Sequence, residues 1–322
     1  MATPVKIGID VGGTKVFTLV LDAATRKILA RTKADTPAGL KFDEFAAFLA
    51  AQAAQTLAEA GSSAADVQHI GVAVPSSVDP ATGVILHSPA LGWKNLPART
   101  PLEKAFGRPV LLDNDVNCGV LAEARLGAGR GSASVVGFFV GTGLGGGIVM
   151  DGKLIRGLRG SAGEFGHTVV RSNGRKCGCG KRGCLEAYCS KTAFGRRFER
   201  LIEKRGMKSC LPELLKDETF RNVRSKVLAK AYRRGDPVVC NVLDKGADML
   251  GIGVANVMAT LAPACVVLGG GVMEALGTDL LPFVRRSAEA HLFGLGPKDL
   301  NLKLAEFGDD AVALGAALLD EA

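Results

Sequence analysis

The sequence contains the same local pattern twice: a short apolar strand, a turn rich in adjacent glycines, and a second strand. The first copy spans residues 6–21 and the second spans residues 135–150. The alternation of residue types on either side of each turn predicts two β-hairpins. Two similar hairpins indicate two related α/β halves, each beginning with one hairpin. A length of 322 residues suffices for two domains.

Further helices and strands are expected between and after the hairpins. Apolar periodicity predicts helices and strands over the following ranges: helices at 43–60, 115–126, 191–204, 223–234, 236–261 and 310–319, and strands at 70–74, 109–112, 265–268 and 302–307. Residues 75–93 hold Pro, Gly, Ser and Asp and predict a long connection. We expect the change of domain near Asn117, which separates residues 1–117 from residues 118–308.

Composition restricts the class of protein. The chain is 47% hydrophobic, but it has no apolar run of the roughly 18 residues that a membrane span needs, and it enters a strand directly at Lys6. We therefore expect a cytoplasmic protein that does not bind membranes. The net charge of +8 raises the question of nucleic acid, yet one Trp and two Tyr leave little surface for stacking bases. A solvated basic face, or attraction of an anionic substrate such as ATP, explains the charge better.

Three glycine clusters are candidate phosphate-binding loops, at 12–13, 141–146 and 269–271. Adjacent glycines let backbone N–H groups approach a phosphate closely, although an ordinary tight turn is the commoner explanation of each cluster alone. The G-x-G-x-x-G at 141–146 precedes a strand and not a helix, and Lys15 has the wrong spacing for a P-loop. Two phosphate-binding hairpins remain, with Asp10 placed to meet the magnesium of Mg-ATP and the third cluster near the nucleoside.

A cysteine cluster predicts a metal site. Cys177, Cys179 and Cys184 lie within eight residues, and His167 precedes them by ten. One histidine and three cysteines are typical of a structural zinc site, which we favour over free thiols. The other five cysteines stand singly in apolar segments and are expected to be buried.

Three carboxylates stand out near these motifs. Asp115 lies where a strand passes into a helix, a place that holds a side chain rigidly at a sheet edge, although an ordinary helix cap is the alternative. Glu164 and Glu186 are close in sequence to the proposed zinc ligands His167 and Cys184. The metal would fix both carboxylates as acceptors for the hydroxyls of a polyol; without it each is a surface charge.

The motifs together resemble the ROK family of bacterial sugar kinases and repressors. They occur in this order over nearly the whole chain: DVGGTK at 10–15, NDVN at 114–117, GTGLGG at 141–146, EFGH at 164–167, CGCGKRGCLE at 177–186 and LGGG at 268–271. The resemblance implies the actin, hexokinase and Hsp70-like ATPase fold, with two α/β domains around an interdomain cleft and a zinc loop at 167–186. It also implies that a C-terminal helix at about 309–322 returns to the first domain.

The resemblance implies roles for individual residues. Asp115 would be the catalytic base, while Asn114, Asp115, Glu164, His167 and Glu186 would bind sugar hydroxyls, with His167 also binding zinc through its other ring nitrogen. The residues expected to contact Mg-ATP are Asp10, Gly12, Gly13, Thr14, Lys15, Gly141, Thr142, Gly143, Gly269 and Gly270.

The same resemblance leaves the substrate open. Glucose is the first expectation, and N-acetylmannosamine or N-acetylglucosamine the second, because Ser76 stands where glucokinase-like members usually have glycine and because Ser88 lies in a segment that lines the sugar pocket. A sugar-responsive regulator without a DNA-binding domain is a third expectation, disfavoured by the intact Asp115. The sequence does not decide between ATP and polyphosphate as donor, and the relatives imply a homodimer.

Overall fold

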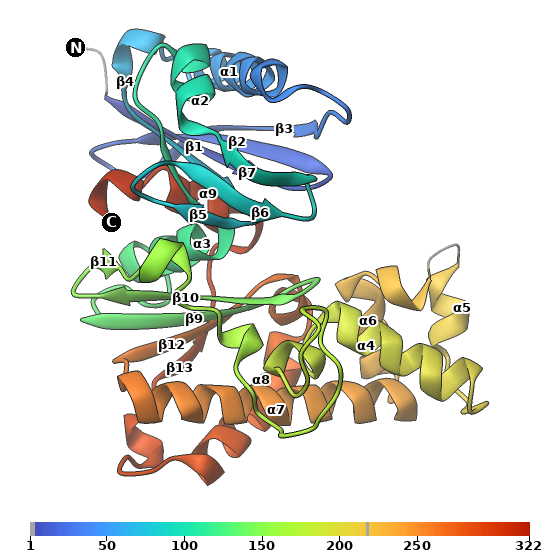
Figure 1. The fold of residues 1–322 in the computed structure, drawn as a ribbon. Coiled ribbons are helices and arrows are strands. Elements are labelled where there is room, and N and C mark those ends of the chain that lie inside the picture. The colour runs from blue at the N-terminus through green and yellow to red at the C-terminus, as the bar shows by residue number, and fades with distance from the viewer. Residues whose placement is uncertain (1–3, 217–218) are drawn as a thin grey trace. The chain divides into compact units, whose positions relative to one another are not determined.

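Each predicted hairpin becomes part of a five-stranded sheet in the computed structural model, which describes residues 4–216 and 219–322 (Figure 1). In the first sheet β1 pairs antiparallel with β2 and parallel with β4, so that Gly8 lies opposite Leu19 on one side and Gly71 on the other. The strand order is β3 (Ile28–Asp35), β2 (Lys15–Asp22), β1 (Val5–Val11), β4 (Val67–Val74) and β8 (Leu111–Asn114).

The second sheet has the same plan. Its strand order is β11 (Lys153–Leu154), β10 (Leu144–Met150), β9 (Ser134–Val140), β12 (Cys265–Gly269) and β13 (Leu302–Leu304). The hairpin strands β9 and β10 are neighbours, and β12 runs parallel to both β9 and β13. The prediction that two related halves each begin with a hairpin is therefore confirmed for the order of the strands.

The segment at 75–93, predicted as a long connection, contains strands that were not predicted. This segment contributes to a three-stranded sheet of β5 (Ser77–Asp79), β6 (Val84–Ser88) and β7 (Trp93–Pro97). The strands are short, and the turn residues between them obscured the alternation of apolar and polar residues. Val78 and Ile85 of this sheet are buried in the core of the first unit. Strand β3 also went unpredicted, because its mixed sequence ILARTKAD contains no apolar run.

Helices α1 (Phe42–Glu59), α2 (Arg99–Phe106), α3 (Asp115–Arg125) and α9 (Ala311–Ala316) accompany the first sheet. The backbone of helix α9 packs directly against the backbone of β1 at Gly8. A Cβ on Gly8 would lie 1.8 Å from the Ala313 carbonyl oxygen. A Cβ on Gly315 would likewise lie 1.7 Å from the Cys118 carbonyl oxygen of α3. Glycine is required at both places, and this close packing holds α3 in position.

Five helices surround the second sheet or its connections: α4 (Lys191–Phe198), α5 (Leu211–Leu215), α6 (Ser225–Arg233), α7 (Pro237–Leu261) and α8 (Gly271–His291). The predicted helix at 191–204 is α-helical only to Phe198 and continues as a π-helix at Glu199–Glu203. Single 3-10 turns lie at Ala64–Asp66, Leu158–Gly160, Phe165–His167, Leu185–Ala187, Phe220–Asn222, Pro297–Asp299, Gly308–Asp310 and Leu319–Glu321. Among the described residues, no helix has both the length and the apolar character that crossing a bilayer requires.

The described chain divides into two compact units. The first comprises residues up to Gly131 with Gly147–Gly163 and Asp309–Ala322, and the second comprises Ser132–Gly146 and Glu164–Gly308. The expected boundary at residue 117 differs from this division, because it falls inside α3. That helix remains whole in the first unit, where it packs against α9.

Candidate active site

The junction of β8 and α3 in the first unit presents two polar side chains, Asn114 and Asp115. Asn114 is the helix N-cap, since its Oδ1 accepts hydrogen bonds from the backbone N–H groups of Val116 at 2.8 Å and Asn117 at 3.1 Å. The alternative in which Asp115 is the cap is therefore wrong. Asp115 is instead the first residue of the helix.

The Asp115 carboxylate is held in place by its neighbours. Its Oδ1 accepts from Asn114 Nδ2 at 2.8 Å and from the Val116 backbone N–H at 2.9 Å. Asn114 Nδ2 also donates to the Ser76 carbonyl oxygen at 3.2 Å, which fixes the orientation of the amide. The helix N-terminus favours the negative charge. The result is an oriented carboxylate that can accept a proton.

Two residues that the sequence reasoning missed support this junction. Asp113 is 4% exposed, and its Oδ1 accepts from Asn117 Nδ2 and from the Asn114 backbone N–H, both at 2.8 Å. Its Oδ2 accepts from Arg156 Nε at 2.6 Å. The acidic pair in DND was a visible signal for Asp113, but no sequence pattern linked Arg156 to a residue 43 positions earlier.

Asp10, near the end of β1, lies in an acidic environment within the first unit. Burial raises the pKa of its carboxyl group from 3.8 to about 7, and the negative charges of Asp115 and Asp309 add to the rise, while Lys33 opposes it. Carboxylate oxygens gathered in this way suit a hard cation such as Mg²⁺, which would stabilise the ionised form. The residues present therefore fit the predicted role of Asp10.

The first glycine turn is exposed and tightly closed. The Gly12 N–H donates to the Lys15 carbonyl oxygen at 2.9 Å, and the Gly12 carbonyl accepts from Thr36 Oγ1 at 2.7 Å. A Cβ on Gly13 would lie 3.2 Å from the Ala90 carbonyl oxygen. Thr14 is exposed beside these glycines, whereas the Lys15 ammonium forms an ion pair with Asp35.

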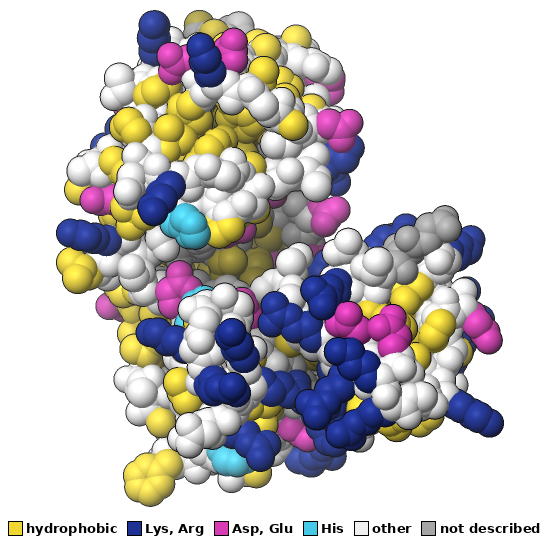
Figure 2. All heavy atoms as spheres, turned by 45° about the vertical axis from the view of Figure 1, so that its right-hand side comes forward, with side chains coloured by type: hydrophobic (Ala, Val, Ile, Leu, Met, Phe, Trp, Pro, Cys, Tyr) yellow, Lys and Arg dark blue, Asp and Glu magenta, His cyan; other side chains and the backbone are white. Residues whose placement is uncertain are grey.

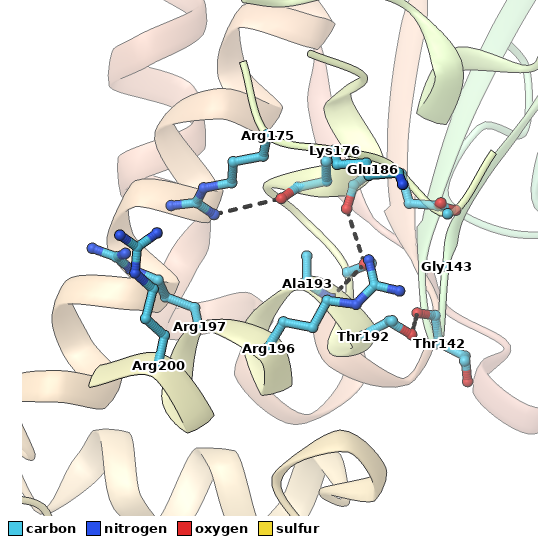
Figure 3. Close-up of a pocket in the computed structure, with 13 residues that line it drawn as sticks. Thr142, Gly143, Arg175, Lys176, Glu186, Thr192, Ala193, Arg196, Arg197 and Arg200 are labelled. Atoms are coloured by element: carbon cyan, nitrogen blue, oxygen red, sulfur yellow. Dashed lines mark hydrogen bonds between the residues drawn. The ribbon is translucent and has the colours of Figure 1, made fainter. Parts of the chain in front are cut away.

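The second glycine loop is attached to the start of α4 (Figure 3). The carbonyl oxygens of Gly141 and Thr142 accept from the backbone N–H groups of Lys191 at 3.0 Å and Thr192 at 3.2 Å. Thr192 Oγ1 also donates to the Thr142 carbonyl at 2.8 Å. The loop that was predicted to bind phosphate is thus rigid.

Glu186 lies against this loop. Its Oε2 accepts from the Leu144 backbone N–H at 3.1 Å, and a Cβ on Gly143 would come within 2.6 Å of the same oxygen. Gly143 therefore has to be glycine for Glu186 to keep this position. The structure thus brings a predicted sugar ligand next to a predicted nucleotide contact, which the sequence could not show across 43 residues.

The predicted metal ligands converge. The donor atoms of His167, Cys177, Cys179 and Cys184 all lie within 4.8 Å of one another. Cys179 Sγ is 3.7 Å from Cys184 Sγ, and Cys177 Sγ is 3.8 Å from His167 Nδ1. Metal–sulfur bonds of about 2.3 Å in a tetrahedron require sulfur–sulfur separations of about 3.8 Å, so the four donors fit zinc. Because Nδ1 faces the cysteines, the His167 Nε2 is the nitrogen left for a hydroxyl.

Glu164 precedes the 3-10 turn Phe165–His167, and its side chain is exposed. A Cβ on Gly166 would lie 2.0 Å from the Leu144 carbonyl oxygen, so the turn rests directly on β10. Glu186 and this turn, which ends at the predicted metal ligand His167, therefore both contact Leu144.

The third glycine cluster has a packing role. Gly270 has a φ of +82°, and a Cβ there would lie 2.7 Å from the Val140 carbonyl oxygen, while a Cβ on Gly269 would lie 2.8 Å from the Phe139 ring. Gly269 lines a pocket of about 150 Å³ that does not include the 141–143 loop. A nucleoside contact at this cluster stays a prediction.

Ser76 and Ser88 are not presented to solvent. Ser76 Oγ donates to the His87 carbonyl at 2.7 Å, and Ser88 Oγ donates to the Pro75 carbonyl at 3.0 Å. The two residues are 6% and 0% exposed. Their hydroxyls brace the loop between β4 and β6, which argues against the expected direct contact with a sugar.

The sequence and fold were compared with those of known proteins. The ROK family pattern matches residues 6–322. The chain belongs to the ROK family. A glucokinase of Thermotoga maritima is 34% identical over 312 residues, which is 97% of this chain and 95% of that protein. An N-acetylgalactosamine kinase of Shewanella sp. is 33% identical, with 97% and 95% covered.

Solved structures give the same result for this ROK protein. A ROK family glucokinase from Streptomyces griseus in complex with glucose and AMPPNP has a TM-score of 0.80 at 33% identity, covering 98% of each chain. A ROK hexokinase from Thermus thermophilus has a TM-score of 0.79 at 34% identity, covering 98% of this chain and 97% of that one. The expected ROK kinase fold is thereby confirmed.

Proposed function

We propose that this ROK protein transfers the γ-phosphoryl group of ATP to a hexose hydroxyl, with glucose as acceptor, glucose 6-phosphate as product and Asp115 as the catalytic base. The observation that carries the proposal is the Asp115 carboxylate, oriented at the start of α3 by Asn114 and by the helix backbone. The enzyme class is that of the ATP-dependent sugar kinases, because glucokinases and a complex with an ATP analogue stand among its similar proteins.

Asp115 would accept the proton of the sugar hydroxyl as the hydroxyl oxygen attacks the γ-phosphorus. The N–H groups of the two glycine loops would bind the phosphates of the donor. Catalysis of phosphoryl transfer depends on positioning the reactants and stabilising charge, and it needs no covalent intermediate with the protein. Asp10 would hold the Mg²⁺ of Mg-ATP, which supplies neutralisation of the phosphate charge.

Sugar hydroxyls would be bound by Asn114, Glu164, the Nε2 of His167, and Glu186. A zinc ion on Cys177, Cys179, Cys184 and the Nδ1 of His167 would fix the second-unit members of this set. A carboxylate or imidazole held in this way loses little conformational entropy when a hydroxyl binds.

An N-acetylated hexosamine is the second candidate acceptor. It is favoured by the similarity to the N-acetylgalactosamine kinase of Shewanella sp., which at 33% identity is as similar as several glucokinases. N-acetylmannosamine and N-acetylglucosamine belong in the same test.

The test is ATP-dependent phosphorylation of a panel containing glucose, mannose, fructose, allose and the N-acetylated hexosamines. We expect one sugar to be turned over rapidly and Asp115→Asn to lower kcat by about 10²-fold or more, with sugar binding retained in calorimetry. Asp151→Asn, on an exposed turn of the same unit, is the matched control. Absence of turnover with every sugar, or an Asp115→Asn variant as fast as wild type, would refute the proposal.

A further inference from the structure

A cavity of about 550 Å³ in the second unit is lined by the loop at 171–175, by Tyr188 and by helix α7. Volumes of about 300–1,000 Å³ are usual for sites that bind small molecules. The side chains that line it most directly are Arg171, Asn173, Arg175, Lys245, Asp248 and Met249. None of the residues predicted to bind sugar or Mg-ATP is among the residues of this lining.

The wall of the cavity is preformed. The Gly174 N–H donates to the Arg171 carbonyl at 3.1 Å, which closes the turn of the loop. The Tyr188 hydroxyl accepts from the Arg175 backbone N–H at 2.9 Å, and a Cβ on Gly174 would lie 2.1 Å from that hydroxyl. Tyr188 is 5% exposed, and Met249 packs against the apolar cluster that contains it. A ligand would therefore bind without much ordering of the wall, which favours affinity.

The cavity carries positive charge that is not neutralised. Among the described residues, Arg171, Arg175 and Lys245 form no ion pair with a carboxylate. Lys245 Nζ donates to a neutral amide oxygen of the same helix at 3.1 Å. Asp248 is the acidic residue of the lining, and its ion pair, at 3.6 Å, is with Arg286 outside the lining. Figure 2 shows Lys and Arg side chains gathered over one surface of the molecule. A bound anion would neutralise the excess charge of the cavity.

The lining fits one phosphate group attached to a neutral, hydroxylated remainder. A phosphomonoester carries about 1.5 to 2 negative charges at pH 7, and guanidinium and ammonium groups are its usual partners. Asp248 would repel a longer polyanion, whereas its carboxylate and the Asn173 amide can both bind hydroxyl groups. The Arg175 guanidinium already covers the Tyr188 ring at 4.6 Å, which leaves little of that ring for stacking a nucleotide base. The lining therefore favours a sugar phosphate over a nucleotide or a chain of phosphates.

Arg175 connects the cavity with the turn that carries Glu186. Its Nη1 donates to the Ala187 carbonyl at 3.5 Å, within the turn Leu185–Ala187 (Figure 3). A hydrogen bond of this length is weak, so a phosphate in the cavity would compete successfully for the guanidinium. Loss of the bond would loosen the turn and with it the Glu186 carboxylate, which accepts from the Leu144 N–H beside the 141–143 loop.

We infer that this cavity is a second binding site, for a phosphomonoester of a polyhydroxylated compound, and that the hexose 6-phosphate made by the enzyme occupies it and slows turnover. The phosphate would lie among Arg171, Arg175 and Lys245, and Asp248 would bind hydroxyl groups of the sugar. The identity of the ligand as hexose 6-phosphate, and its effect on turnover, rest on the proposed kinase function.

The first experiment is calorimetric titration of the full chain with glucose 6-phosphate, with glucose and AMPPNP present at saturation to occupy the active site. We expect binding that weakens as salt rises. In Arg171→Gln/Lys245→Gln the affinity should fall about tenfold or more, because charge-assisted hydrogen bonds are lost. Lys226→Gln/Lys230→Gln is the matched control, since it removes the same charge from exposed positions of α6 outside the cavity and should leave the affinity unchanged.

Asp248→Ala tests the hydroxyl half of the ligand. The ratio of the affinity for glucose 6-phosphate to the affinity for inorganic phosphate should fall in this variant, because only the sugar phosphate has hydroxyls to lose. Inorganic phosphate that binds wild type as tightly as glucose 6-phosphate does would overturn the assignment of a polyhydroxylated ligand.

The second experiment measures ATP-dependent phosphorylation with glucose and ATP both saturating. Added glucose 6-phosphate should slow the wild type and leave Arg171→Gln/Lys245→Gln unaffected. Turnover without a difference between these two proteins, either in binding or in slowing by glucose 6-phosphate, would overturn the inference and leave the kinase function standing. Absence of turnover with every sugar would remove the kinase function and the effect on turnover, while loss of binding in the double variant would still support the site.

Discussion

Asp10→Asn should make the first unit more stable at high pH, even if it removes catalysis. In the wild type, burial and two acidic neighbours raise the pKa of Asp10 from 3.8 to about 7. Between these values the folded protein holds a proton that the unfolded chain has released, so the free energy of unfolding falls as pH rises from about 4 to about 7. Asparagine carries no charge and should lack this dependence.

The size of the effect follows from the two pKa values. Each pH unit between the two pKa values corresponds to about 1.4 kcal/mol of unfolding free energy. The wild type would therefore lose at most about 3 kcal/mol of stability between pH 5 and pH 8. Because the Asp10 side chain keeps partial exposure, solvent screens its charge. We expect the variant to gain about 1–2 kcal/mol over wild type on moving from pH 5 to pH 8.

The assay is urea unfolding in magnesium-free buffer, followed by Trp93 fluorescence. Trp93 is the one tryptophan in the sequence and packs edge-on against Phe42 and Phe45, so its emission reports on the first unit. Asp151→Asn controls for loss of an exposed carboxylate. If the stability difference between wild type and Asp10→Asn is equal at pH 5 and pH 8, the electrostatic account of Asp10 is wrong.

Three further predictions concern the support of the site. Gly143→Ala should lower kcat/KM by about tenfold or more with little loss of thermal stability, because a Cβ would displace the Glu186 carboxylate; an unchanged kcat/KM would contradict this. Arg156→Gln should destabilise the protein by about 3 kcal/mol in urea titration, because it leaves the buried Asp113 carboxylate without its cationic partner, and a loss under 1 kcal/mol would refute a structural ion pair. Removing metal with a chelator, or Cys184→Ser, should raise the KM for sugar more than the KM for ATP; metal analysis showing no bound zinc would contradict the assignment.

The parts of the fold that could be predicted are those governed by local pattern. Both glycine hairpins, the capped helix α7 and the metal cluster depend on residues close together in the sequence, and their spacing was sufficient. The β5–β7 sheet was missed because three-residue and five-residue strands with polar members carry no clear period.

The candidate site residues could be named from the sequence, and their roles stay predictions, but the contacts between them could not be foreseen. The ionic partner of Asp113 comes from Arg156, and the neighbour of Gly143 is Glu186, and both pairs depend on tertiary packing. Ser76 and Ser88 show the converse, since their polar side chains suggested ligand binding while their burial commits them to the backbone.

The glycine contacts of α9 affect the order in which the two units can fold during synthesis. The first unit needs Gly8 at its start and Ala313 and Gly315 near its end, whereas the second unit is complete at Gly308. During synthesis the second unit can therefore finish folding first. Helix α3, which carries Asp115, would gain its contact with α9 only after residues 309–322 have left the ribosome, so the carboxylate site would assemble after the second unit.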